Sequence, residues 1–403
     1  MIMLAIDGGR PVRTRPFAPW PVFDRDEIEA TVQVLTSGRV NYWTGGECIT
    51  FEQEFATAIG RRYAISLANG TLALELALLA SGIGPGDDVI VPSRTFIATA
   101  SCVVARGARP IIADVDPDSG NLTAATIAAV LTPQTRAVIP VHLGGWPCMM
   151  DDIMALAKAR GIHVIEDCAQ AHGARYKGVS AGSYGLCAAF SFCQDKIMTT
   201  GGEGGMLVTD DEMLWRRAWE FKDHGKSWDA VRSRDHPPGF RWLHESFGSN
   251  YRMTEMQAAI GNRQLQKLPF WLDRRRENAR ILETGFSDVM GLRVPLPNDD
   301  VNHSYYKFYA YLNEELLSPG WNQLRIIEAI NAEGIPCMVG SCSEIYRERA
   351  FVTAGLGPMM QLPTASQLGR TSLMFLVHPT LDAEDMQDAV AAVKKVMFIA
   401  TGT

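Results

Sequence analysis

The sequence has no hydrophobic run long enough to span a membrane. Its most apolar helix-like stretch, residues 72–80, is interrupted by Glu75, whereas a membrane-spanning helix needs about 18 or more consecutive apolar residues. The first nine residues also lack the basic start of a signal peptide. These absences predict a protein without membrane contact that works in the cytoplasm.

The sequence also has no excess of positive charge. Its 403 residues include 38 Lys and Arg against 45 Asp and Glu, which gives a formal net charge of −7. The one dense basic run, residues 274–276, lies in a helical pattern and is more typical of a solvated helix face. Because affinity for nucleic acid comes largely from clustered Lys and Arg, we expect no nucleic-acid partner.

Paired cysteine motifs and metal-binding patterns are missing as well. The eight cysteines are scattered without a C-x-x-C pair, and no histidine cluster has the spacing of a zinc site. Most of the cysteines stand among Ala, Phe, Val or Ile, which favours reduced thiols in a protein core. We therefore expect neither disulfides nor a metal.

Two nucleotide-binding fingerprints are absent. There is no G-x-x-x-x-G-K-[ST] loop and no G-x-G-x-x-G, since the glycines at residues 82–86 enclose a proline. This disfavours a nicotinamide-dependent oxidoreductase. A binding test with nucleotide cofactors would distinguish such an enzyme from the other candidates. No internal repeat stands out either, so a solenoid is not expected.

Short β-rich runs and helical patterns alternate between residues 60 and 210. The runs are apolar without regular alternation, as expected for strands that are covered on both faces. Alternation with helices predicts an α/β fold with a mainly parallel, seven-stranded sheet flanked by helices. The expected strands are residues 65–67, 88–92, 110–115, 136–141, 162–166, 188–192 and 205–209.

The pattern changes after residue 250. A long helix is expected over residues 254–283, followed by a strand over 305–312 and an amphipathic helix over 383–397. We therefore expect three parts: an N-terminal arm (1–25), a large domain (26–275) and a smaller α+β C-terminal domain (276–403).

Two chemically informative residues follow predicted strands, where open α/β sheets bind ligands. Asp167 ends one strand, and a carboxylate among apolar residues needs a cationic partner, although from this segment alone a helix N-cap is the more ordinary role for Asp. Lys196 follows the next strand and precedes a glycine-rich segment. A shielded lysine can form a Schiff base, but most lysines are simply exposed.

A third feature is the Asn69-Gly70-Thr71 step before an apolar helix. Free backbone N–H groups and the positive end of the helix dipole make such a step an anion site, or merely a capped helix start. An anion site, an acid and a lysine together are what pyridoxal 5′-phosphate (PLP) requires: phosphate at the helix, carboxylate at the pyridinium nitrogen and lysine at C4′.

Five motifs in this order make the sequence similar to a known family. The motifs are NGTLAL at 69–74, VPSRTFIAT at 91–99, EDCAQAHG at 166–173, SF at 191–192 with Lys196 and EGG at 203–205, and NYRMTEMQAA at 250–259. The chain resembles the DegT/DnrJ/EryC1/StrS family of PLP-dependent sugar aminotransferases, which have the fold type I of aspartate aminotransferase. The resemblance covers nearly the whole chain.

The resemblance implies a role for each matching residue. Lys196 corresponds to the Schiff-base lysine, Asp167 to the pyridinium partner, and Gln170 to the partner of the ring's phenolic oxygen. Phe96 corresponds to the aromatic residue that stacks on the ring. The remaining positions match phosphate ligands, with the last one reaching in from the partner subunit: Gly70, Thr71, Ser191 and Asn250.

The resemblance also implies an activity. The expected enzyme is a homodimer with shared active sites that moves an amino group from L-glutamate to a keto group of a nucleotide-linked deoxysugar. Its product would serve a surface polysaccharide such as lipopolysaccharide O-antigen, or a secondary metabolite. A cyclitol ketone as acceptor and a regulatory protein on the same fold remain alternatives. Relatives that dehydrate sugars carry histidine in place of the lysine, so Lys196 disfavours that reaction.

Loops outside the motifs are weaker candidates. Residues 222–248, with His236, Arg241, Trp242 and His244, fall where relatives have the mouth of the active site. His303 and the Tyr305-Tyr306-Lys307 segment fall where small-domain substrate contacts occur. A solvated surface loop explains any one of these residues equally well.

Overall fold

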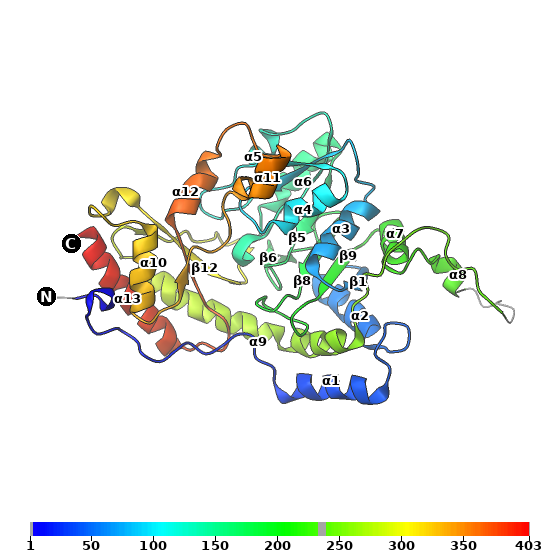
Figure 1. The fold of residues 1–403 in the computed structure, drawn as a ribbon, viewed down its shortest axis with the longest axis horizontal. Helices are drawn as coiled ribbons and strands as arrows, with labels where there is room; N and C mark the ends of the chain where they lie inside the picture. The colour runs from blue at the N-terminus through cyan, green and yellow to red at the C-terminus, as the bar shows by residue number, and fades with distance from the viewer. Residues whose placement is uncertain (1–2, 233–238, 403) are drawn as a thin grey trace.

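The computed structural model describes residues 3–232 and 239–402, and its centre is a seven-stranded sheet (Figure 1). The strand order is β1-β9-β8-β5-β4-β2-β3, and every neighbouring pair is parallel except those that β9 forms with β1 and β8. The prediction of a mainly parallel sheet is confirmed. The strands are β1 (Tyr63–Leu67), β2 (Asp88–Pro92), β3 (Arg109–Ala113), β4 (Thr135–Val138), β5 (His163–Asp167), β8 (Cys187–Ser191) and β9 (Gly205–Thr209).

Helices cover both faces of this sheet. On one face α3 (Gly70–Ala80), α4 (Ala98–Ala105) and α7 (Glu212–Lys222) form one core cluster with the strands. On the other face α2 (Glu47–Ile59) packs phenylalanines against β8, while α5 (Ala124–Ala128) and α6 (Met150–Arg160) cover β4 and β5. Burial on both faces is the reason that the strands are apolar throughout.

A second, antiparallel sheet lies in the C-terminal part with the strand order β10-β12-β14-β13. It shares a core cluster with α9, α10 and α13. These elements are β10 (Leu292–Arg293), β12 (Phe308–Leu312), β13 (Cys337–Met338), β14 (Ser372–Phe375), α9 (Glu255–Phe286), α10 (Gln323–Ala332) and α13 (Ala383–Thr401). The other described strands and helices are β6 (Arg175–Tyr176), β7 (Val179–Ser180), β11 (Val301–Asn302), α1 (Arg25–Ser37), α8 (Trp228–Arg232), α11 (Arg349–Ala354) and α12 (Pro363–Thr371).

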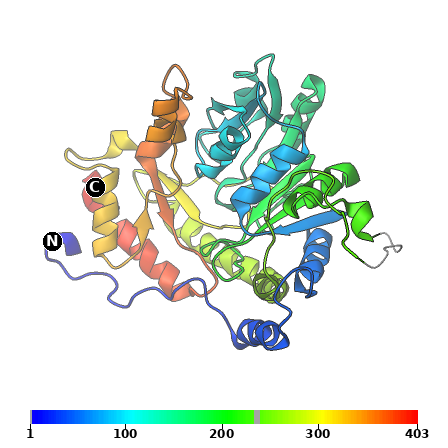
Figure 2. The same ribbon diagram turned by 45° about the vertical axis from the view of Figure 1, so that its right-hand side comes forward.

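The chain before α1 runs along the C-terminal part of the molecule (Figure 2). Leu4 belongs to the C-terminal core, and the Arg13 guanidinium forms an ion pair of 2.6 Å with Asp385 in α13. Helix α9 is 32 residues long and continues through position 275. The domain boundaries at 25 and 275 therefore stay predictions, because one helix connects both parts.

One predicted strand begins later than expected. The strand expected over 305–312 starts at Phe308, because Tyr305 adopts a left-handed backbone conformation with φ of 47° that a strand cannot contain. In the part of the chain that the structure describes, no helix has the length and apolar character needed to cross a bilayer.

Candidate active site

A cavity of about 930 Å³ opens at the carboxyl ends of the parallel strands. Asp167 is the last residue of β5 and Ser191 the last of β8, so both end at the same edge of the sheet. Seven of the eight predicted site residues line this cavity: Gly70, Thr71, Phe96, Asp167, Gln170, Ser191 and Lys196.

Asp167 is almost completely buried in this cavity, with 4% of its surface exposed. Its carboxylate accepts hydrogen bonds from the Thr99 hydroxyl (2.8 Å) and from the Ala169 amide (3.1 Å). Burial raises the pKa of Asp167, although these two donors and the charge of Lys196 act in the opposite direction. Within residues 3–232 and 239–402, no Lys or Arg forms an ion pair with it. A ligand that brings a cationic N–H to this carboxylate would complete the site.

Lys196 lies in the segment between β8 and β9. Its Nζ is 4.9 Å from the centroid of the Tyr306 ring, and in the described chain Nζ makes no hydrogen bond or ion pair. The backbone of Lys196 is held in place, because the Trp20 indole N–H donates to its carbonyl oxygen at 2.9 Å. The amine is therefore positioned at the cavity while its nitrogen stays available for chemistry.

The N-terminus of α3 forms another wall of the cavity. The Asn69 side chain caps the helix by accepting from the Leu72 amide at 3.0 Å. A Cβ at position 70 would lie 2.6 Å from Cβ of Ser191, so only glycine allows this close approach. The result is a helix N-terminus that presents backbone N–H groups and the Thr71 and Ser191 side chains, which suits an anion such as phosphate.

Two further predicted residues lie between these walls. The Gln170 side-chain oxygen accepts from the Gly144 amide at 2.7 Å, which fixes the orientation of its amide group. Phe96 leaves 67% of its surface exposed although it is a large apolar residue. An exposed aromatic ring that lines a cavity is suited to cover a planar ligand.

The eighth predicted residue, Asn250, is exposed and does not line the cavity of its own chain. The described parts of the 222–248 segment do not line it either, and His236 lies outside the described residues. Lys222 is fully buried with its Nζ 3.7 Å from the centroid of the Tyr42 ring. His303 is also buried, and it stacks on Tyr305 away from the cavity.

The C-terminal part supplies a wall of the cavity that the sequence motifs only partly indicate. Tyr306 and Lys307, which were weak candidates, line it together with residues that no motif indicated: Tyr309, Met338, Gly340, Ser341 and Cys342. Asp195, next to the lysine, accepts a hydrogen bond from the Tyr306 hydroxyl. Sequence reasoning could have found Asp195, because it stands beside Lys196. No local sequence pattern indicates that residues 338–342 line the cavity.

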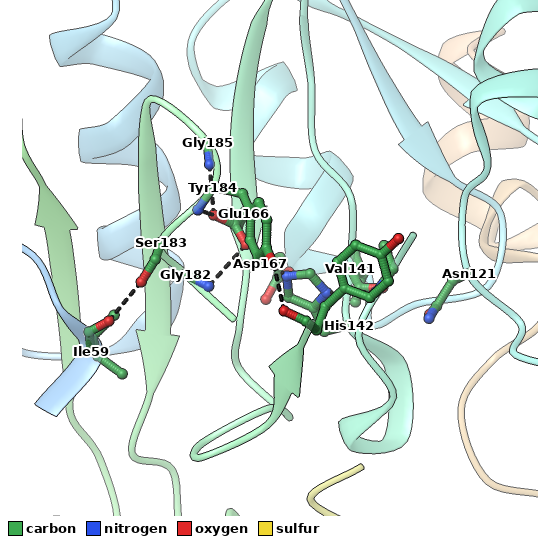
Figure 3. Close-up of polar contacts among 12 residues, drawn as sticks. Ile59, Asn121, Val141, His142, Glu166, Asp167, Gly182, Ser183, Tyr184 and Gly185 are labelled. Atoms are coloured by element: carbon green, nitrogen blue, oxygen red, sulfur yellow. Dashed lines mark hydrogen bonds and ion pairs between the residues drawn. The ribbon is translucent and has the colours of Figure 1, made fainter. Parts of the chain in front are cut away.

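Glu166 precedes Asp167 in β5 and connects His142 to the loop over residues 182–185 through hydrogen bonds (Figure 3). Its carboxylate accepts from His142 Nε2 (3.0 Å) and from the amides of Gly182, Tyr184 and Gly185 at 2.7–2.8 Å. The Cys148 amide donates to Nδ1 of His142, so both ring nitrogens already have protein partners. Although Cys168 lies close to this pair, the arrangement is that of a structural hydrogen-bond network.

Comparison with known proteins agrees with this geometry. A sequence model of the DegT/DnrJ/EryC1/StrS aminotransferase family matches residues 21–394. GDP-perosamine synthase from Caulobacter vibrioides is 37% identical over 94% of this chain and 97% of its own length. L-glutamine:2-deoxy-scyllo-inosose aminotransferase from Streptomyces kanamyceticus is 34% identical over 98% and 96%.

A solved structure of an aminotransferase from Psychrobacter cryohalolentis superposes with a TM-score of 0.94 at 54% identity, covering 96% of this chain and 100% of that one. The family's enzymes depend on PLP, and the buried Asp167 carboxylate, the amine of Lys196 and the helix N-terminus fit that cofactor. The chain belongs to the DegT/DnrJ/EryC1/StrS aminotransferase family and is a PLP-dependent sugar aminotransferase.

Proposed function

We propose that this enzyme transfers an amino group from L-glutamate to a keto group of a nucleotide-linked deoxysugar. The observation that carries the proposal is the meeting of Lys196 and Asp167 in one cavity of about 930 Å³. Ligand pockets usually measure roughly 300–1,000 Å³, so this one has room for a cofactor and a further substrate. The relative named GDP-perosamine synthase supports a nucleotide sugar as acceptor.

In this proposal Lys196 and Asp167 are the catalytic residues. Bound PLP supplies an electron sink for the pair of electrons left when a substrate carbon loses its proton. The Asp167 carboxylate would keep the ring nitrogen protonated, and this nitrogen would be the cationic partner that no Lys or Arg of the described residues gives to the buried acid. Nζ of Lys196 would anchor the cofactor and act as the general base and acid that removes and returns the proton.

The other residues would bind and orient the cofactor. The phosphate would lie at the N-terminus of α3, with the backbone at Gly70 and the hydroxyls of Thr71 and Ser191 as donors. Phe96 would cover one face of the ring, and Gln170 would contact its phenolic oxygen. These assignments follow the resemblance to the family, and the position of each residue around the cavity supports them.

A homodimer is part of the proposal. Asn250 is exposed in its own chain, and it follows a segment with three strongly exposed aromatic residues, Phe240, Trp242 and Phe247. This segment projects from the body of the molecule beyond α7 (Figures 1 and 2). Exposed apolar groups on a projection are typical of protein contacts, which supports Asn250 as a phosphate ligand in the partner's cavity.

A cyclitol ketone is the second candidate acceptor. The relative that supports it is named for the transfer of an amino group from L-glutamine to 2-deoxy-scyllo-inosose, and it is similar to this chain over nearly its whole length. A cyclitol lacks a nucleotide, so the two candidates differ in the charge and size of the acceptor.

A direct assay separates the candidates. Purified enzyme with PLP would be incubated with L-glutamate or L-glutamine and with 4-keto-6-deoxyhexoses linked to GDP, dTDP or UDP, or with an inosose. The proposal predicts amination of a nucleotide-linked keto sugar, detected by mass spectrometry. Amination of the inosose alone would support the second candidate. No amination of any acceptor after a productive reaction with a donor would contradict both.

A further inference from the structure

Lys307 is a half-buried cation in the C-terminal wall of the cavity. Its side chain is only 15% exposed, and it immediately precedes β12. Its Nζ lies 4.7 Å from the centroid of the Tyr306 ring, and Nζ of Lys196 lies 4.9 Å from the centroid of the same ring. Two amines therefore lie beside one aromatic ring in the same cavity.

The cavity has few other positive charges. Among the described residues that line it, Lys196 and Lys307 are the only cations, whereas Asp167, Asp195, Glu203 and Glu348 contribute acids. Lys196 and Asp167 are assigned to the cofactor, and the phosphate has the N-terminus of α3. Lys307 is thus the side-chain cation that remains for an anionic group of a substrate.

Lys307 has only an incomplete partner in the protein. Its Nζ is 3.8 Å from Asp195 Oδ2, beyond hydrogen-bond distance, and that oxygen already accepts from the Tyr306 hydroxyl. Burial lowers the pKa of Lys307 to about 8, and the charges of Arg275 and Lys196 act in the same direction while Asp195 opposes them. An anion bound at Nζ would relieve this unfavourable position.

We propose that Lys307 binds a carboxylate of the amino-acid donor. The proposal deepens the proposed function and rests on it. A donor whose amine reacts next to Nζ of Lys196 can place a carboxylate near the second amine, since both amines lie beside Tyr306. A single ammonium that is already close to Asp195 suits one carboxylate better than the two charges of a sugar-linked diphosphate.

The test compares Lys307→Gln and Lys307→Arg with the wild type in the two separate half-reactions. Stopped-flow absorbance follows the PLP form with L-glutamate and the pyridoxamine form with a keto acceptor. For Lys307→Gln we expect the apparent Kd for L-glutamate to rise about 10- to 100-fold. We also expect the factor by which the Kd for L-glutamate rises to be at least ten times the factor by which the Kd for the keto acceptor rises. Lys307→Arg should recover most of the affinity.

Binding without turnover gives an independent readout. Calorimetry with 2-oxoglutarate and the pyridoxamine form should show the same loss of affinity in Lys307→Gln. The matched control is Lys158→Gln, because Lys158 is exposed on α6. Cofactor absorbance and circular dichroism check that each variant is folded.

Two outcomes would overturn the proposal. In the first, Lys307→Gln binds L-glutamate and 2-oxoglutarate as tightly as the wild type. In the second, the loss falls mainly on the acceptor half-reaction, which would assign Lys307 to the sugar nucleotide. Failure of the proposed function is distinguishable, because the wild type itself would then not react with L-glutamate or would aminate no nucleotide-linked keto sugar.

Discussion

Asp167 is held in an environment that is unfavourable for a charged carboxylate when no ligand is bound. Burial raises its pKa, and the hydrogen bonds from Ala169 and Thr99 and the charges of Lys196 and His142 compensate only in part. Asp88 provides the contrast, because Arg109 donates two hydrogen bonds of 2.7 Å to it and lowers its pKa. One acid is stabilised by the protein itself, and the other is arranged for a ligand.

Asp167→Asn is therefore expected to reduce turnover by about 10²-fold or more, because the amide cannot keep the cofactor nitrogen protonated. The melting temperature of the protein without cofactor should stay equal or rise, since a buried charge has been removed. Asp88→Asn is the control with the opposite result: a free energy of unfolding lower by about 1–3 kcal/mol and unchanged turnover. Steady-state kinetics and calorimetry measure both. Normal turnover of Asp167→Asn would contradict the assignment.

Lys196→Ala should abolish turnover, with a loss of at least about 10³-fold, while the fold stays intact. The amine makes no hydrogen bond or ion pair in the described structure, so its removal costs little stability beyond the contact with the Tyr306 ring. Lys158→Ala on the surface of α6 serves as the control. A Lys196→Ala enzyme with ordinary kinetics would refute the role of this residue.

At the scale of elements, the ends of β4 and β5 and the loop over residues 182–185 depend on Glu166. Burial alone would raise the pKa of Glu166, but the hydrogen bond from His142 and the backbone amides of the loop lower it. A carboxylate with a lowered pKa contributes stability above its unfolded pKa of about 4.5, and this contribution is lost as the pH falls through the folded pKa.

Glu166→Gln should therefore lower the free energy of unfolding by about 3 kcal/mol at pH 7, because it removes a buried charge that four donors share. The difference from the wild type should shrink below pH 4.5. Urea unfolding at pH 7, 5 and 4 measures it. A difference that stays constant over this range would show that the charge of Glu166 is not what stabilises the loop.

Trp20 connects the N-terminal segment to helix α9 and to the segment that carries Lys196. The indole packs edge-on against Trp271 at 5.1 Å, and its N–H holds the carbonyl of Lys196. Trp20→Phe keeps an aromatic ring but removes this hydrogen bond, so we expect the affinity for PLP to fall by a factor of about 5, which corresponds to about 1 kcal/mol. Fluorescence titration with PLP measures it, with Trp321→Phe as the control. Unchanged affinity would limit Trp20 to a packing role.

Local sequence could predict the seven strands because each is a short apolar run, and it could predict Asp167 and Lys196 because they stand at strand ends. It could not predict the contact between Trp20 and Lys196, which are 176 positions apart. The cavity wall at residues 338–342 was missed for the same reason. Its place depends on how the second sheet packs, which no local pattern encodes.

At the scale of the whole molecule, each cavity is proposed to need two chains. Lys196→Ala and Asn250→Ala enzymes would both be inactive alone, yet a mixed dimer has one cavity with wild-type Lys196 from one chain and wild-type Asn250 from the other. Mixing the two variants after reversible dissociation should restore about a quarter of wild-type activity. No gain over the separate variants, or an active monomer in sedimentation, would contradict shared sites.

The most direct test of the central claim is the absorbance spectrum of the purified enzyme with PLP, before and after L-glutamate. PLP joined to Lys196 should give a visible band, which disappears in favour of pyridoxamine phosphate when L-glutamate is added and is absent from Lys196→Ala. A band that neither L-glutamate nor L-glutamine changes would contradict the proposed donor. The absence of any such band in the wild type would show that Lys196 does not bind PLP, and would contradict the proposed site.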